Sequence, residues 1–301
     1  MPIDLSFTQK HNPHSLSLVN PITPQAAQIA ARNLLQQGLS KTLEHTLGLL
    51  MAAGVLPQYR LPVSGRALRN YHRRRLLDRL AYTSAEVREV LLSYGLPVPD
   101  NAERCLLYTL GPVGIELVKE IHHVPPPSGF LGAPLERLIH DLVVNEIVLR
   151  LSESAMSAGW TPVWLSKYEA NLRRGEVAIL EPDAFLRFKK EEKEFAVLIE
   201  YHNEDKRSRA VDKVRKYEAA YKEKEIWSEQ WEVETFPPVL AVYREKIVGQ
   251  GYFDEIKDNP GKVNFYGRSL DGFFQDLTFW FDFKQQARVK IFPWEEWEEK
   301  A

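Results

Sequence analysis

The chain has 301 residues, of which 44% are hydrophobic and 27% are charged. This composition is that of a globular protein and excludes global disorder, and the length favours two domains. No stretch of about 20 uninterrupted apolar residues exists, so we expect no membrane-spanning helix. A single cysteine, Cys105, excludes intramolecular disulfides and cysteine-based zinc clusters. Because the first residues also lack a signal-peptide pattern, we expect a reducing, cytoplasmic location.

Charge is distributed unevenly along the chain. Residues 1–128 hold 13 basic and 9 acidic side chains, and the rest of the chain holds 26 basic and 32 acidic ones. A stretch at 122–134 with four prolines lies at this change, and it cannot continue a helix or a central strand. We therefore predict an N-terminal arm (1–23), a first domain (24–123), a linker (124–134) and a second domain (135–301).

The first domain reads as mainly helical. Its predicted elements are helices at 25–37, 43–53, 83–94 and 113–121, a basic helix after Ser64, and a strand at 105–110. Gly54 ends the second helix, and Thr83 with Glu86 forms a capping-box pattern. Small helices followed by a strand and a closing helix are typical of a winged helix-turn-helix domain.

The basic helix carries six arginines and one acid, Asp78, between residues 66 and 79. On a helix, Leu68, Leu76, Leu77 and Leu80 face the core and leave the arginines to solvent. A concentrated positive face attracts phosphate, so we predict binding of double-stranded DNA. A solvated helix face or an acidic protein partner are the alternatives. The candidate DNA contacts are Arg66, Arg69, Asn70, Arg73, Arg74, Arg75 and Arg79.

The second domain reads as mixed α/β. Its predicted elements are helices at 135–153 and 209–221, strands at 182–188, 195–201 and 238–243, and weaker strands at 262–266 and 288–292. Trp294 and Trp297 in the C-terminal tail either pack on the core or form an exposed face for a protein partner.

The most informative segment is the pair of strands at 182–188 and 195–201, joined by the charged sequence KKEEKE. In the symmetric antiparallel register, Asp183 and Glu200 face each other, with Cβ atoms about 4.5–5.5 Å apart. Two carboxylates this close repel each other unless a cation or a proton lies between them, and a Mg²⁺ ion resolves the repulsion. His202 points to the same face as Glu200. The alternative is an ordinary hairpin whose terminal acids are exposed to water.

Three further charged side chains are candidates for the same site. Glu146 lies on an apolar helix stripe, four residues after Leu142, so it needs a partner, either an arginine or a metal ion. Lys206 and Lys213 lie on the predicted helix after the second strand. If the basic face of that helix borders the hairpin, it brings an amine to the acids; otherwise it is a solvated surface.

These residues together resemble the PD-(D/E)XK nuclease-like superfamily. Pro182-Asp183 matches the Pro-Asp half of its motif, Glu200 matches the acid on the next strand, and Glu146 matches the helical acid. The resemblance implies a restriction-endonuclease-like α/β domain with a mixed central sheet. It also implies that Asp183, Glu200 and Glu146 bind Mg²⁺ or Mn²⁺.

The motif lacks its lysine, because His202 stands in that position. The superfamily sometimes supplies the lysine from a neighbouring helix, so Lys213 or Lys206 is the candidate replacement. The resemblance then implies that Asp183 and Glu200 hold the metal while Lys213, Lys206 or His202 orients or deprotonates the attacking water.

A narrower resemblance covers most of the chain. The segments YTLGPVG (108–114), HDLVVNE (140–146) and PDA (182–184), followed by Lys213 and Tyr217, occur in an order similar to that of the replication-relaxation family of plasmids and other mobile elements. This chain departs from the family at Gly111 and at the turn after Glu200. The resemblance implies a DNA endonuclease or nickase that acts in replication or strand processing. The alternative is a non-catalytic DNA-binding factor with a degenerate nuclease-like domain, with replication or transposition proteins, or a second copy of the chain, as partners.

Overall fold

The computed structural model describes residues 22–100, 104–165 and 167–294. Helices and strands both occur throughout, so the protein belongs to the mixed α/β class. The chain divides into two compact units. The first contains the described residues up to Val90 and Pro99–Leu138, and the second contains Leu91–Val98 and the chain from Ile139 onward. No helix in the described part of the chain is long and apolar enough to cross a membrane.

The first unit is built on a small antiparallel sheet with the strand order β1-β3-β2. The strands are β1 (Val55–Pro57), β2 (Leu77–Arg79) and β3 (Leu107–Leu110). The helical elements are α1 (Pro24–Gln37), α2 (Lys41–Ala53), η2 (Gln58–Arg60), α3 (Gly65–Arg73), α4 (Ser84–Ser93) and α5 (Pro112–His122). The predicted arm lies almost wholly outside the described residues, although Thr23 caps α1 by accepting a hydrogen bond from the Ala26 amide.

Local capping explains where several of these helices begin and end. The Thr83 amide donates to Glu86 Oε2 at 2.8 Å, and the Glu86 amide donates back to Thr83 Oγ1 at 3.2 Å, which confirms the predicted capping box at α4. Gly54 ends α2 at φ 74°, as predicted. No helix or strand occurs between His123 and Pro134, where the linker was predicted, while the division between the units falls slightly later, inside α6.

The predicted basic helix is only half correct. Helix α3 ends at Arg73, and Arg75 adopts a left-handed backbone with φ 58°. The chain then turns into strand β2, so Leu77 and Arg79 lie on a strand that pairs with β3. A left-handed residue cannot continue a right-handed helix, which is why the helical prediction fails at this point.

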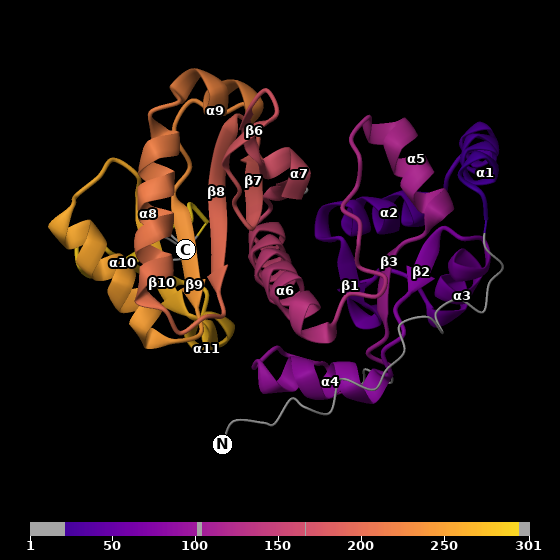
Figure 1. Ribbon diagram of the computed structural model, residues 1–301, viewed down its shortest axis with the longest axis horizontal. Coiled ribbons are helices and arrows are strands. Elements are labelled where there is room, and N and C mark those ends of the chain that lie inside the picture. The colour runs from indigo at the N-terminus through magenta and orange to yellow at the C-terminus, as the bar shows by residue number, and fades with distance from the viewer. Residues whose placement is uncertain (1–21, 101–103, 166, 295–301) are drawn as a thin grey trace. The chain divides into compact units, whose positions relative to one another are not determined.

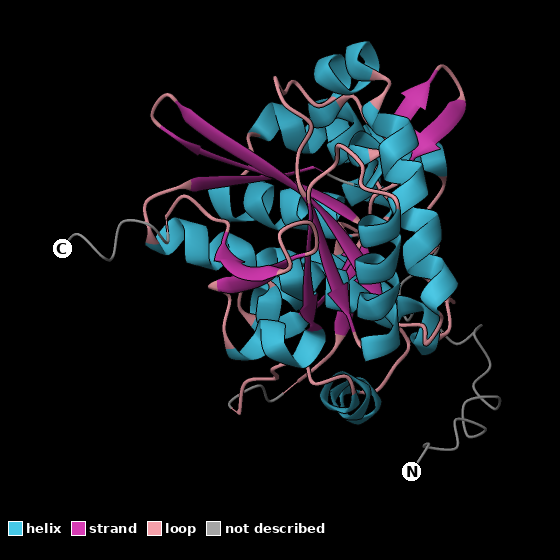
Figure 2. Ribbon diagram, turned by 90° about the vertical axis from the view of Figure 1, so that its left-hand side faces the viewer, coloured by secondary structure: helices cyan, strands magenta, loops and turns pink. Residues whose placement is uncertain are grey.

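The second unit contains a seven-stranded mixed sheet with the order β12-β11-β10-β9-β8-β7-β4 (Figures 1 and 2). Its strands are β4 (Thr161–Leu165), β7 (Ala184–Lys190), β8 (Lys193–His202), β9 (Val239–Tyr243), β10 (Phe265–Ser269), β11 (Phe279–Asp282) and β12 (Ala287–Lys290). Strands β8, β9 and β10 are parallel, and the other neighbouring pairs are antiparallel. A separate hairpin pairs β5 (Leu172–Arg174) with β6 (Val177–Leu180).

Helices cover both faces of this sheet. They are α6 (Leu135–Ser157), α7 (Lys167–Ala170), α8 (Arg207–Tyr221), α9 (Lys224–Gln230), α10 (Lys246–Asp258) and α11 (Leu270–Gln275). Helices α8 and α10 share the core of one face with inward residues of β7 to β10. Helix α6 lies on the other side of the central strands (Figure 1), where the Trp294 indole donates to Ser154. Trp294 is therefore buried in the core, and Trp297 lies outside the described residues.

The register of the β7–β8 hairpin is the one that the symmetric pattern predicts. Ala184 pairs with Ile199, and Lys190 pairs with Lys193 across a two-residue turn. The Asp183 amide donates to the Ile199 carbonyl at 3.1 Å, which extends the ladder by one residue. Asp183 therefore lies opposite Glu200, at the end of β8 that parallel β9 shares.

Candidate functional site

Asp183 stands just before β7 and receives contacts from two directions. The Tyr201 amide donates to its Oδ2 at 2.8 Å, and His140 Nε2 from α6 lies 3.1 Å from its Oδ1. Burial raises the pKa of this carboxyl, but His140, Lys213 and the Tyr201 amide outweigh burial, and the pKa lies well below its usual value. Asp183 is therefore an anion at neutral pH.

Glu200 is fully buried near the end of β8. The Tyr217 hydroxyl from α8 donates to its Oε1 at 2.6 Å, and Lys213 Nζ lies 2.5 Å from its Oε2. Burial and the neighbouring Asp183 raise the pKa of this carboxyl, while Lys213 and Tyr217 oppose the rise. The two acids thus have different proton affinities although they face each other.

Lys213 is the cation that the two acids share. It projects from α8, one turn before Tyr217, so both side chains reach Glu200 from the same helix face. Burial lowers the pKa of Lys213, but Glu200 and Asp183 together raise it above its usual value. The amine therefore stays charged at neutral pH and offsets the repulsion between the carboxylates.

The other two basic candidates lie differently. His202 is buried two residues after Glu200, as predicted, and its Nε2 lies 2.7 Å from the Tyr252 hydroxyl of α10. Lys206 is exposed at the start of α8, two helical turns and therefore about 10 Å before Lys213. Of the two lysines, Lys213 is the one that contacts Glu200.

Glu146 is buried on α6, and Arg150 one turn later lies 3.2 Å from its Oε1. Of the two partners that the sequence left open, the structure shows the arginine. Glu146 also follows His140 by six residues, which places it about 240° around the helix from the residue that contacts Asp183. The expectation that Glu146 completes the acid pair is not supported by this arrangement.

The described residues contain no group of three or more His, Cys, Asp or Glu side chains arranged to hold a metal. Magnesium is often bound by only one or two carboxylates, with water and substrate phosphate as its other ligands. Glu200 Oε2 is buried against the Lys213 ammonium at 2.5 Å and has no further partner among the described residues. Asp183 and Glu200 thus supply the two carboxylates that such a site uses, and a Mg²⁺ or Mn²⁺ ion there would take its other ligands from water and a substrate phosphate.

A second candidate site is the exposed face of α3 in the first unit. Arg66, Arg69, Asn70 and Arg73 are all exposed, and their spacing of three and four residues places them on one stripe. None of these arginines forms an ion pair with any residue that the structure describes. Arg74, which caps the helix, is exposed as well.

The positive surface extends from α3 onto the small sheet. Arg69, Arg79 and Arg104 each lower the pKa of the buried Tyr108 hydroxyl, although burial has the larger effect and raises the pKa overall. Arg79 is directly opposite Tyr108 across the β2–β3 ladder. Arg79, which the sequence predicted, is therefore close enough to Tyr108 for its charge to act on the same hydroxyl as Arg69 of α3. Arg104 acts on this hydroxyl too, although the sequence pattern did not single it out.

Arg75 differs from its neighbours, because the expectation that its side chain is solvated is wrong. Its side chain is only 13% exposed, and its guanidinium lies 2.9 Å from the buried Asp78 carboxylate. Burial raises the pKa of Asp78, and Arg75 and His72 oppose this effect. The Arg75–Asp78 ion pair thus stabilises the turn between α3 and β2.

Sequence reasoning missed His140 and Tyr217 as direct partners of the acids. Both occur in the segments that carried the family resemblance, which was the only available signal. Comparison with known proteins finds no family model, no curated protein and no solved structure that matches this chain.

Proposed function

We propose that this protein binds DNA through its first unit and hydrolyses a phosphodiester bond at Asp183, Glu200 and Lys213 with the help of a divalent metal. The observation that carries the proposal is the convergence of these three side chains at the end of β8. An acid after proline, an acid on the adjoining strand and a lysine are the elements of the PD-(D/E)XK motif. The lysine comes from α8 rather than from β8.

Each residue has a chemical role in this proposal. When bound, a Mg²⁺ or Mn²⁺ ion polarises the phosphate and activates water. Asp183 and Glu200 hold that ion. Lys213 carries its proton at neutral pH, so it stabilises the negative charge that develops on the phosphate and does not act as a base. His140 and Tyr217 keep the two carboxylates in place.

The proposed role of the first unit is to bind duplex DNA as a winged helix. The β1-β3-β2 sheet and the preceding helices support this fold, and the exposed arginines of α3 supply the charge that phosphate requires. A protein of this design acts in replication or strand processing, as the resemblance to the replication-relaxation family implies.

A plasmid-nicking assay with Mg²⁺ or Mn²⁺ tests the catalytic proposal. We expect Asp183→Asn and Lys213→Met each to reduce cutting by about a hundredfold or more, because the first removes a carboxylate that holds the metal and the second removes the cation that stabilises charge on the phosphate. Glu192→Gln, which neutralises an exposed acid in the β7–β8 turn, is the matched control and retains wild-type cutting. Equal cutting by wild type and Asp183→Asn overturns the proposal.

A non-catalytic DNA-binding factor is the second candidate function. It is favoured by one observation, namely that both carboxylates already have partners from the chain itself. In that case the cluster is structural, and salt-sensitive DNA binding occurs without metal-dependent cutting.

A further inference from the structure

A cavity lies on the same face of the large sheet as Glu200, beneath α10. One stripe of α10 lines it, because Lys246, Gly249, Gln250 and Phe253 are spaced by three and four residues. The cavity has a volume of about 380 Å³, which is within the range of roughly 300–1,000 Å³ that small-molecule sites occupy. Nothing in the proposed cutting reaction uses these residues.

Two glycines make the room in which the aromatic walls of the cavity lie. A Cβ atom at Gly249 would be 2.5 Å from the Tyr243 ring, and one at Gly267 of β10 would overlap the ring of Phe283. Only glycine at these two positions lets both rings lie against the backbone. The cavity is therefore a specific feature of the sequence and not a gap left by poor packing.

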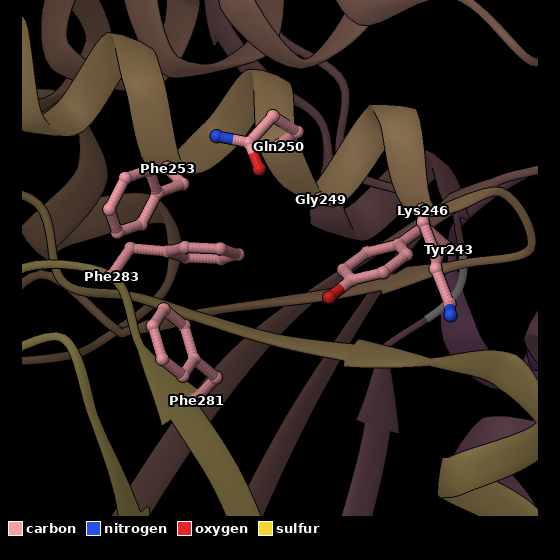
Figure 3. Close-up of a pocket in the computed structure, with 7 residues that line it drawn as sticks. All are labelled: Tyr243, Lys246, Gly249, Gln250, Phe253, Phe281 and Phe283. Atoms are coloured by element: carbon pink, nitrogen blue, oxygen red, sulfur yellow. The ribbon is translucent and has the colours of Figure 1, made fainter.

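The lining combines apolar rings with unsatisfied polar groups (Figure 3). Phe253, Phe281 and Phe283 gather at one end, and Tyr243 lies at the other. The Gln250 amide nitrogen donates to Asp254 at 2.7 Å, so the amide oxygen is left as the acceptor that points toward the space between the rings. The Tyr243 hydroxyl and the Lys246 ammonium have no partner within the part of the chain that the structure describes.

This set of groups matches a nucleotide. A nucleobase has two flat faces that stack on aromatic rings, exocyclic N–H groups that donate to an amide oxygen, and an attached phosphate that attracts an ammonium group. An aliphatic ligand would leave the polar groups unused. A simple carboxylate ligand could pair with Lys246, but it would leave the aromatic rings and the Gln250 acceptor unused.

The cavity is close to the acid pair. Tyr243 pairs with His202 in the parallel β8–β9 ladder, so its side chain shares a face with His202 and Glu200. Moving one strand across and two residues along the sheet separates Tyr243 from Glu200 by roughly 8 Å. Tyr243 is the last residue of β9, and Glu200 lies two residues before the end of β8, so both are near the carboxyl ends of parallel strands, where ligands bind in open α/β sheets. A single strand of DNA whose phosphate is at the acids can therefore reach the cavity with a nearby base.

We propose that the cavity lined by Tyr243, Gln250, Phe253 and Phe283 receives one unstacked base of single-stranded DNA. The proposal rests on the function proposed above and names its substrate as a strand that is unpaired beside the cutting site. The first unit then holds the duplex, and the second unit selects the single strand.

Binding measurements in EDTA test this without any cutting. Fluorescence anisotropy of a labelled oligodeoxyadenylate is compared with that of a labelled duplex, for the full chain. We expect Phe253→Ala to weaken single-strand binding by about tenfold, since it removes a stacking ring. Gln250→Leu, at an exposed position that the fold does not need, weakens it several-fold. Duplex binding stays unchanged in both variants.

Two controls match these changes. Ile247→Ala alters an exposed α10 residue outside the stripe, and Lys224→Ala removes an exposed lysine from α9, which does not line the cavity. Both controls bind the single strand as wild type does. If Phe253→Ala and Gln250→Leu bind as tightly as these controls, the cavity proposal is overturned.

The remaining outcomes separate the cavity from the proposed hydrolysis. If the protein cuts plasmid DNA but the cavity variants bind single-stranded DNA as tightly as wild type, the cavity proposal alone is contradicted. A protein that never cuts, but whose single-strand binding depends on Phe253 and Gln250, supports the cavity and contradicts the proposed hydrolysis. If free deoxyadenosine monophosphate displaces the labelled strand at the concentration at which the strand itself binds, the cavity binds a free nucleotide, and the proposal that it binds a base of single-stranded DNA is overturned.

Discussion

The two units manage their charges in opposite ways. In the first unit, Arg66, Arg69 and Arg73 stand exposed along α3 without an acid partner among the described residues. In the second unit, Glu200 is buried and Lys213 is 26% exposed, and the two are in direct contact. Exposed cations without partners cost the fold little and remain available to an external polyanion, whereas buried charges depend on each other.

This difference distinguishes side chains that bind an external ligand from side chains that hold each other in position inside the fold. Removing an exposed arginine weakens attraction to phosphate and leaves the fold intact. Removing one member of the buried cluster leaves its partner desolvated and uncompensated. The unfolding free energy is therefore the measurement that distinguishes the two kinds of site, independently of any activity.

The largest effect is expected at Lys213. Lys213→Ala leaves the Glu200 carboxylate without its cation, and we expect a loss of about 3–5 kcal/mol in the free energy of unfolding by urea. Because burial raises the pKa of Glu200, the folded state binds this proton more tightly than the unfolded state. The loss is therefore largest at neutral pH and shrinks as the pH falls toward the usual glutamate range.

The double variant Glu200→Gln with Lys213→Met is the control for this experiment. It replaces both charges, so most of the lost stability returns. If Lys213→Ala alone is as stable as wild type at pH 7, the ion pair does not contribute to the stability of the second unit.

An intermediate effect is expected at Arg75, which brings the buried kind of charge into the first unit. Arg75→Met leaves Asp78 buried without its guanidinium partner, and we expect a loss of about 1–3 kcal/mol. The neighbouring Arg74→Met removes an exposed guanidinium and changes stability by less than about 0.5 kcal/mol. Equal unfolding curves for the two variants contradict the distinction between buried and exposed arginines.

The smallest effect on stability is expected from Arg66→Ala, Arg69→Ala and Arg73→Ala combined. Each exposed site contributes less than about 0.5 kcal/mol to unfolding. The salt dependence of duplex DNA binding nevertheless changes, because the slope of log affinity against log salt falls by about 0.9 for each phosphate that the protein no longer neutralises. An unchanged slope removes α3 from the DNA interface.

Local patterns predicted the parts of the fold that local physics determines. The acid pair follows from counting residues outward from a short turn, and the capping box at Thr83 follows from two residues three apart. The partners of Asp183 and Glu200 come from α6 and α8, and no local pattern specifies how those helices pack. The site was thus predicted as a pair of acids and not as a cluster.

The errors also have identifiable causes. Helix α10 was not predicted, and it contains two glycines, Gly249 and Gly251, which lower helix propensity. In the structure a Cβ at Gly251 would lie 2.7 Å from the Arg207 carbonyl oxygen, so the glycine lets α10 approach α8 closely. Strands β1 and β2 have three residues each, too few for a period of two to be recognised.

The turn between β7 and β8 sets the strand register, and the register determines which residues face each other at the far end of the hairpin. Seven paired positions separate this turn from the level of Asp183 and Glu200. One extra residue on either arm, without a compensating bulge, reverses the facing of every side chain beyond it and sends one acid into the layer occupied by α6. Exposed residues of the hairpin can therefore be substituted without moving the acids, whereas a change in the number of residues between the acids moves one of them to the other face.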